Sequence, residues 1–205
     1  MFSGTRHLAH QLGLDAPLAC VDGSHIVHAP SGREMHAAPL ASKAAQALME
    51  VLGEFGPAAF AFSDDRVFHE PEGARYLHYV RTWSEQTNEV GNLLFDVDWQ
   101  GERVHVTAVV ALVQRTLRAL DLLLAAGIDK GTAIDWLAQH YGVAPEEIVA
   151  VGDWLNDIPM LRRVGRGFAM AQAPDEVKAV ASEVLDADAW TGGGLEEAAR
   201  RAGLI

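Results

Sequence analysis

Hydrophobic and polar positions alternate in short blocks along the last third of the chain. Residues 130–141 carry apolar side chains at helical spacing, and Gly142 follows as a helix stop. The run at 148–152 is typical of a strand that is buried on both faces of a parallel sheet. The expected helices cover residues 130–141, 145–147, 158–163, 174–181 and 195–202. The expected strands cover residues 148–152, 167–170 and 184–185. This alternation predicts a doubly wound α/β layer with a mostly parallel sheet.

The stretch 30–105 breaks the alternation with short strands and turn signals. Ahead of residue 114, the expected helices cover residues 5–13 and 40–53, and the expected strands cover residues 17–21, 25–28, 58–62, 67–69 and 103–113. Residues 114–126 favour helix through Leu, Ala and Arg, although their hydrophobic period is ambiguous. We therefore predict an α/β core of residues 1–27 and 110–205, and an inserted α+β domain of residues 28–109.

The composition limits the classes of partner and compartment. The 205 residues carry 28 acidic against 16 basic side chains, a formal net charge of −12. We therefore expect no nucleic-acid partner, because phosphate backbones need a basic surface. Charged side chains interrupt the most apolar region, 104–128, so we expect no membrane partner or span. Cys20 is the single cysteine, which excludes an intrachain disulfide and a Cys-rich zinc site. The first residues lack an apolar signal segment, and we expect a cytoplasmic protein.

The most informative segment is the acidic bend that follows the apolar run 149–151. Gly152 allows a sharp turn, and Asp153, Asn156 and Asp157 then bring oxygen ligands into one short stretch. Ligands of open α/β sheets bind at the carboxyl ends of the strands. Mg²⁺ prefers one or two carboxylates together with water and phosphate oxygens. A solvated loop rich in Asp and Asn is the alternative interpretation of this motif taken alone.

Several motifs of the C-terminal part follow one another in a fixed order. They are Asp129-Lys130-Gly131, the run GDWLND at 152–157, Pro159-Met160-Leu161, Gly167-Phe168-Ala169-Met170, Ala173 and Gly192-Gly193-Gly194. Together they resemble the haloacid dehalogenase (HAD) superfamily, and more narrowly its Cof-type phosphatases, from about residue 119 to the end. A weaker resemblance covers residues 8–27, where Asp22-Gly23 and Cys20 are similar to the segment that leads into the family's cap domain. The resemblance implies a Rossmann-like core with a mobile cap, here a shortened one.

The resemblance also implies a Mg²⁺-dependent phosphohydrolase. Mg²⁺ would be held partly by Asp153, with Asp157 and Asn156 orienting the metal shell directly or through water. Lys130 would face the phosphate and offset its charge during attack, so Lys130 and Asp153 are the candidate catalytic residues and Lys130 and Asn156 are candidate phosphate ligands. The phosphoryl group would pass to an aspartate and then to water. The implied substrate is a small phosphorylated metabolite, first of all a sugar phosphate.

Two departures from the family pattern accompany this resemblance. The family's opening strand carries a DxD motif that supplies the nucleophile and the general acid/base, and Met1 lies after the place of that motif. Ser3 resembles the phosphate-binding hydroxyl of the family's second motif but stands too close to Leu12, and Asp22 stands where the family has Asn. Both are candidate phosphate or substrate ligands. The 105–120 region is also too short for a full cap. We therefore expect a truncated or internally deleted member that is weak or inactive as given.

Two alternatives use the same residues differently. One is a non-catalytic HAD-like fragment or pseudo-enzyme that acts as a binding or partner subunit; a second copy of this chain, pairing across an open sheet edge, is then a candidate partner. The other is a receiver-like signalling domain, which is disfavoured because the acidic pair here follows the lysine and comes late in the chain. In the leading interpretation we expect Trp154 and Leu155 to pack rather than to contact substrate.

Overall fold

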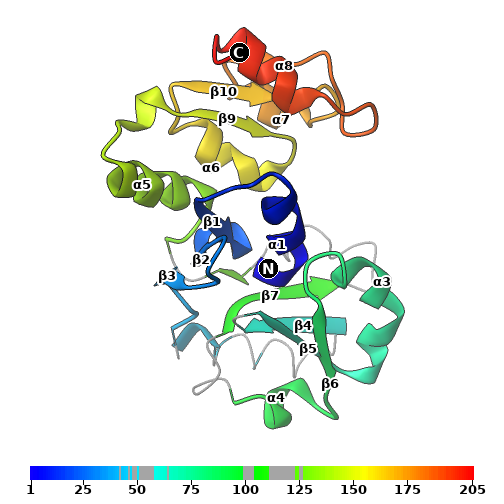
Figure 1. Ribbon diagram of the computed structural model, residues 1–205. Helices are drawn as coiled ribbons and strands as arrows, with labels where there is room; N and C mark the ends of the chain where they lie inside the picture. The colour runs from blue at the N-terminus through cyan, green and yellow to red at the C-terminus, as the bar shows by residue number, and fades with distance from the viewer. Residues whose placement is uncertain are drawn as a thin grey trace. The chain divides into compact units, whose positions relative to one another are not determined.

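The computed structural model describes residues 1–41, 43–45, 47, 50, 58–63, 65–98, 104–110, 123–124 and 127–205. Contacts divide the chain into two compact units, Met1–Gly127 and Ile128–Ile205 (Figure 1). The predicted boundaries of a core at 1–27 and 110–205 and a cap at 28–109 stay a prediction. Within the described ranges, no helix has the length and apolar character needed to span a membrane.

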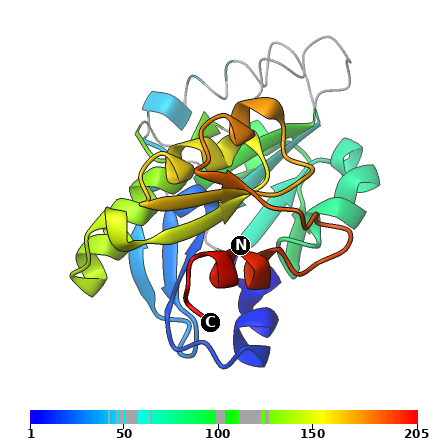
Figure 2. The same ribbon diagram turned by 90° about the horizontal axis from the view of Figure 1, so that it is seen from above.

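The Ile128–Ile205 unit alternates helix and strand, as the sequence predicts. Its strands are β9 (Val149–Gly152), β10 (Arg166–Ala169) and β11 (Glu183–Val184), which are parallel and stand in the order β11-β10-β9. Its helices are α5 (Lys130–Tyr141), α6 (Ile158–Leu161), α7 (Asp175–Lys178) and α8 (Gly194–Arg201), with short 3₁₀ turns η3 (Pro145–Glu147) and η4 (Leu155–Asp157). Figure 2 shows the yellow and orange strands β9 and β10 running side by side.

Helices cover both faces of this small sheet. On one face, Ala150 of β9 and Ala169 of β10 pack with Leu161 of α6 and Val177 of α7. On the other face, Phe168 packs with Leu185 and with Ala198 of α8. Figure 1 shows α8 on one side of β9 and β10 and α6 on the other. Because successive strand residues point to opposite faces, two covered faces explain the nearly continuous apolar runs, and the predicted doubly wound arrangement is confirmed.

The ends of α5 are set by local sequence. Asp129 caps the helix: its Oδ1 accepts the Thr132 N–H at 2.9 Å, and the Thr132 hydroxyl accepts the Asp129 N–H at 3.1 Å. Gly142 ends the helix with a φ of 67°, in the left-handed region that glycine adopts readily. The cap matters for the site, because it fixes Lys130 as the first residue of the helix.

The Met1–Gly127 unit holds two sheets. A five-stranded sheet has the order β6-β5-β4-β7-β8, in which only the β5–β6 pair is parallel among the described strands. Its strands are β4 (Ala58–Ser63), β5 (Arg66–His69), β6 (Gln86–Glu89), β7 (Val104–Val110) and β8 (Leu123–Leu124). A three-stranded antiparallel sheet contains β1 (Pro17–Cys20), β2 (His25–His28) and β3 (Glu34–Ala37). The helical elements are α1 (Phe2–Gln11), η1 (Val21–Gly23), η2 (Pro71–Tyr76), α3 (Leu77–Val80) and α4 (Leu93–Asp96).

The central strand β4 is buried along its whole length. Phe60 and Phe62 pack on one face with Val67, and Ala59 and Ala61 pack in a separate cluster on the other face. The pattern is that of a strand covered on both sides.

Two predicted helices of this unit have different outcomes. The helix predicted over 114–126 is wrong at Leu123–Leu124, which pair as β8 with Thr107 and Val106 of β7; the rest of that range lies outside the described residues. Strand pairing overrides the helix propensity of leucine there. Of the helix predicted over 40–53, residues 43–45, 47 and 50 are helical, and residues 42, 46, 48–49 and 51–53 lie outside the described residues.

Candidate active site

Lys130 and Asp157 form the centre of the candidate site. The Lys130 ammonium donates to Asp157 Oδ1 at 2.5 Å, across 27 residues of sequence. The Lys130 side chain is one-third exposed, whereas Asp157 is only 3% exposed. A buried carboxylate needs a partner of opposite charge, and the first residue of α5 supplies it.

Asp157 also fixes the bend that follows β9. Its Oδ2 accepts two backbone N–H groups, from Asp153 at 2.7 Å and from Trp154 at 3.0 Å. The carboxylate therefore joins the ammonium of α5 to the backbone of the bend. This geometry confirms that the lysine and the acidic bend, which are separate in sequence, lie together.

Two glycines allow this close approach. A Cβ built on Gly152 would lie 2.6 Å from the Asp157 Cβ, closer than real Cβ atoms come to another heavy atom. A Cβ on Gly131 would lie 2.8 Å from the Pro159 carbonyl oxygen and would also meet the Arg163 guanidinium. Arg163 in turn donates to Asp135 of α5 at 3.0 Å and to the Pro159 carbonyl at 3.3 Å, which holds α5 against α6.

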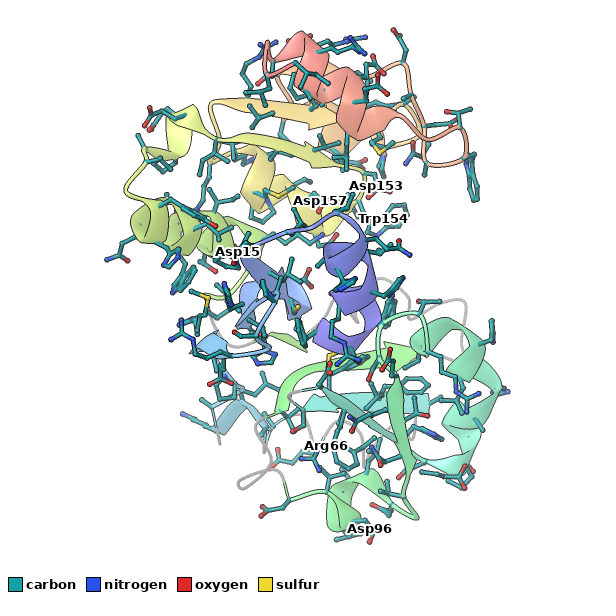
Figure 3. All side chains as sticks on the ribbon, in the orientation of Figure 1. Asp15, Arg66, Asp96, Asp153, Trp154 and Asp157 are labelled. Carbon is teal, nitrogen blue, oxygen red and sulfur yellow. The ribbon has the colours of Figure 1, made fainter. Side chains whose placement is uncertain are left out.

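Asp153 is the accessible acid of the bend. Its side chain is exposed at the end of β9, and its Oδ2 accepts a hydrogen bond from Gln172 Nε2 at 3.2 Å. Asn156 is half-buried in η4. Figure 3 shows Asp153, Trp154 and Asp157 gathered at the end of β9. The bend thus carries one exposed and one buried carboxylate, and the Lys130 ammonium of α5 meets the buried one.

The donor set fits a hard divalent cation with few protein ligands. Both Asp157 oxygens are already engaged by N–H donors, whereas Asp153 presents an exposed carboxylate. Over the described part of the chain, no three His, Cys, Asp or Glu side chains converge as a metal-binding group. Mg²⁺ tolerates this, because water and substrate phosphate complete its octahedral shell. The residues therefore suit Asp153 as a ligand and Asp157 as the group that holds the bend.

The expectation that Trp154 and Leu155 pack is wrong. Trp154 is 59% exposed and Leu155 is 45% exposed. The bend is closed by hydrogen bonds to Asp157, so it does not need these two side chains in a core.

The other two predicted ligands belong to the Met1–Gly127 unit. Ser3 is 4% exposed; its N–H and its hydroxyl donate to Asp65 at 2.9 and 3.0 Å, and its hydroxyl accepts the Glu85 N–H at 3.0 Å. Asp22 lies in η1 between β1 and β2 with a φ of 52°. Ligand roles for Ser3 and Asp22 stay predictions.

Sequence reasoning missed Gln172. It follows β10 closely, as Asp153 follows β9, and the two strands are parallel neighbours. Polar side chains just after adjacent parallel strands meet at one edge of the sheet. That rule, applied to β10 as well as to β9, would have found it.

Comparisons with known proteins agree with this geometry. The sequence model of a family described as haloacid dehalogenase-like hydrolase matches residues 1–103 and 105–193. HMP-PP phosphatase of Klebsiella pneumoniae (strain 342) is 30% identical over 189 residues, which are 84% of this chain and 69% of that protein. Phosphoglycolate phosphatase of Methanopyrus kandleri is 41% identical over 61 residues, which are 30% of this chain and 26% of that protein.

Solved structures show the same fold. A haloacid dehalogenase-like hydrolase from B. subtilis has a TM-score of 0.75 at 20% identity, covering 88% of this chain and 78% of that one. A HAD subclass IIB sugar phosphatase has a TM-score of 0.77 at 19% identity, covering 98% of this chain and 80% of that one. At these identities the likeness concerns the fold.

Proposed function

We propose a phosphohydrolase function on the premise that this chain belongs to the haloacid dehalogenase-like hydrolases, among the Cof-type phosphatases. The substrate is a small phosphorylated metabolite, and Mg²⁺ is the cofactor. The names of the relatives support this class: they include phosphatases of HMP-PP, of phosphoglycolate and of a sugar phosphate. A sugar phosphate is our first candidate, and the single cysteine, which allows no disulfide within the chain, supports a reaction in the reducing cytoplasm.

The observation that carries the proposal is the contact between Lys130 and Asp157. It brings an ammonium within 2.5 Å of a buried carboxylate whose other oxygen closes the bend bearing Asp153. A solvated Asp-rich loop, the alternative for this motif, would not need an aspartate whose side chain is only 5% exposed. An exposed carboxylate on the bend and a fixed ammonium from α5 beside it are what phosphate chemistry requires, because negative charge must be offset as phosphate is attacked.

Each residue has a separate role in this proposal. Asp153 would hold Mg²⁺, which when bound supplies Lewis-acid polarisation of a phosphoryl oxygen. Asp157 keeps the bend closed and holds Lys130 in place through its two oxygens. Lys130 offsets phosphate charge, and Asn156 in η4 binds the phosphate. The attacking carboxylate that the family resemblance implies is assigned to no residue of this chain.

Hydrolysis of p-nitrophenyl phosphate tests the proposal. We expect the turnover to be weak, to need Mg²⁺ and to fall at least about 100-fold in Asp153→Ala, because even residues behind the metal ligands typically matter 10–100-fold. Lys130→Ala should lose activity on a similar scale, whereas Glu146→Ala, at an exposed acid of η3, should match the wild type. Turnover that is equal in Asp153→Ala and wild type would refute the assignment.

A second candidate function is favoured because no residue of this chain is assigned as the attacking carboxylate. Residues 1–14 carry no carboxylate side chain, and Asp15, just ahead of β1, is hydrogen-bonded to His28 Nε2 at 3.0 Å. A non-catalytic HAD-like subunit would bind Mg²⁺ or phosphate without turnover, alone or as a pair of identical chains. Calorimetric titration with Mg²⁺ and with inorganic phosphate, alongside the hydrolysis assay, separates the two functions: heat without product supports the second.

A further inference from the structure

Gln172 bridges two parts of the Ile128–Ile205 unit. Its Nε2 donates to Asp153 Oδ2 at 3.2 Å, and its Oε1 accepts the Ala189 N–H at 3.1 Å. Asp153 follows β9, while Ala189 lies in the segment 188–193, the loop that precedes α8. One side-chain amide therefore links Asp153, the exposed acid of the bend, to a loop that lies far from it in the sequence.

The chemistry of the two partners fixes the orientation of the amide. An ionised carboxylate only accepts hydrogen bonds, so Asp153 must face the NH₂ group. A backbone N–H only donates, so Ala189 must face the carbonyl oxygen of Gln172. Turning the amide by 180° would break both bonds at once. If the bond to Asp153 is lost, the amide is free to turn, and the bond to Ala189 is weakened; the reverse also holds.

Internal hydrogen bonds order the 188–193 loop around Ala189. Asp188 Oδ1 accepts the Trp190 N–H at 2.9 Å and the Thr191 N–H at 2.7 Å, so the loop closes on its own first residue. The hydrogen bonds from the Thr191 N–H and the Thr191 hydroxyl, together with the one from the Trp190 N–H, hold the pKa of Asp188 below its ordinary value. Trp190 is 88% exposed, so the loop's order depends on hydrogen bonds rather than on a packed indole.

We propose that Gln172 is a positioning residue that orients the Asp153 carboxylate and couples it to the 188–193 loop. The part of the proposal that concerns Mg²⁺ rests on the proposed function of Asp153. With Oδ2 held by Gln172, the other Asp153 carboxylate oxygen would be left for Mg²⁺, and Asp153 would lose less rotational freedom on holding the ion. Through the bond to Ala189, a change at the Asp153 carboxylate alters how firmly the 188–193 loop is held.

Amide hydrogen exchange of Ala189, followed by NMR without Mg²⁺, tests the coupling. We expect Gln172→Leu to speed exchange by about 5-fold, the effect of one lost hydrogen bond of ordinary strength. Asp153→Ala should also speed the exchange of Ala189, by about 2-fold. In the Gln172→Leu background it should add nothing, since the link from Asp153 through Gln172 to Ala189 is then already broken. Gln139→Leu, at an exposed glutamine of α5, is the matched control and should leave Ala189 unchanged.

A loop-bracing role alone predicts a different result. Gln172 would then protect Ala189 whether or not Asp153 is present, and Asp153→Ala would leave the exchange rate at the wild-type value. That outcome, or unchanged exchange in Gln172→Leu, overturns the proposal. Both substituted side chains are exposed, so both variants should fold.

Calorimetric Mg²⁺ titration adds a second readout. We expect the Kd for Mg²⁺ to rise about 3- to 10-fold in Gln172→Leu, the effect of about one lost hydrogen bond, and to stay unchanged in Gln139→Leu. An unchanged Kd in Gln172→Leu overturns the orienting role. Absence of p-nitrophenyl phosphate turnover in every variant would count against the proposed function only, because the exchange measurement needs neither metal nor substrate.

Discussion

Two carboxylates in this chain hold separate segments together, and they differ in what they hold. Asp157, in the Ile128–Ile205 unit, accepts the N–H groups of Asp153 and Trp154 and an ammonium from Lys130. Asp65, in the Met1–Gly127 unit, accepts the N–H and the hydroxyl of Ser3, which lies 62 residues away.

The difference teaches what turns a structural carboxylate into part of a site. The hydrogen bonds from Ser3 attach α1 to Asp65 through neutral donors, and they serve to hold the two segments together. Asp157 has its charge offset by Lys130, and the bend that it closes then presents a second carboxylate, Asp153, on the surface. A fixed ammonium beside an exposed acid at a strand end is the feature that favours phosphate chemistry.

The largest expected effect comes from removing Asp157. Asp157→Ala leaves a partly buried ammonium and two backbone N–H groups without their acceptor, so we expect the Ile128–Ile205 unit to lose about 3–5 kcal/mol of unfolding free energy. Phosphohydrolase activity should be lost with it. Urea denaturation followed by hydrogen exchange at β9 and β10 measures the change in that unit.

Asp157→Asn is the matched control for the charge. Its amide oxygen can still accept an N–H, so it should fall between Ala and wild type in stability. A loss below about 1 kcal/mol in Asp157→Ala would mean that the bend does not depend on this carboxylate.

Crowding at Gly152 gives the next effect. Because an added Cβ would lie 2.6 Å from the Asp157 Cβ, Gly152→Ala must push the bend outward, at a cost of about 2–3 kcal/mol. Gly91→Ala is the matched control, since its Cβ would meet only the flexible Asp96 carboxylate, at 3.1 Å. Thermal unfolding of both variants decides the point, and equal costs would show that the tight approach of Gly152 to Asp157 is not needed.

Asp65→Ala should destabilise the other unit by about 1–2 kcal/mol, because the loss leaves the partly buried donors of Ser3 unpaired. Cys20 reports on that unit: burial raises the pKa of its thiol, so the folded protein should react slowly with iodoacetamide near neutral pH. We expect faster Cys20 alkylation in Asp65→Ala and no change in Asp157→Ala. Faster alkylation in both variants would mean that the two carboxylates do not act on separate units.

Local sequence was sufficient for the elements around the site and insufficient for its long-range contacts. The stop at Gly142 and the glycine turn at the end of β9 depend on neighbours within a few residues, so their positions could be predicted. The Gln172 bond to Asp153 spans 19 residues and depends on the pairing of β9 with β10.

The same physical reason explains the errors. Leu123–Leu124 have helical propensity, yet pairing with β7 makes them a strand. Trp154 was expected to pack, but backbone hydrogen bonds to Asp157 close the bend without its indole. Propensity and residue type describe averages, whereas tertiary pairing decides these particular positions.

The smallest effect concerns acid stability at the far end of the Ile128–Ile205 unit. Glu197 accepts the N–H groups of Asp186 and Ala187 at 3.0 and 2.9 Å and pairs with Arg201, and these contacts hold its pKa below the ordinary 4.5. Since the folded pKa lies below the unfolded one, the contribution to stability is complete above pH 4.5 and is lost as the pH falls through the folded value. Glu197→Gln should therefore flatten the acid side of the stability profile, by a small amount because solvent screens the group. Glu196→Gln, which removes a pair with Arg200 on the same helix, is the control, and identical acid profiles for the two variants would show that the N–H contacts of Glu197 contribute nothing to α8.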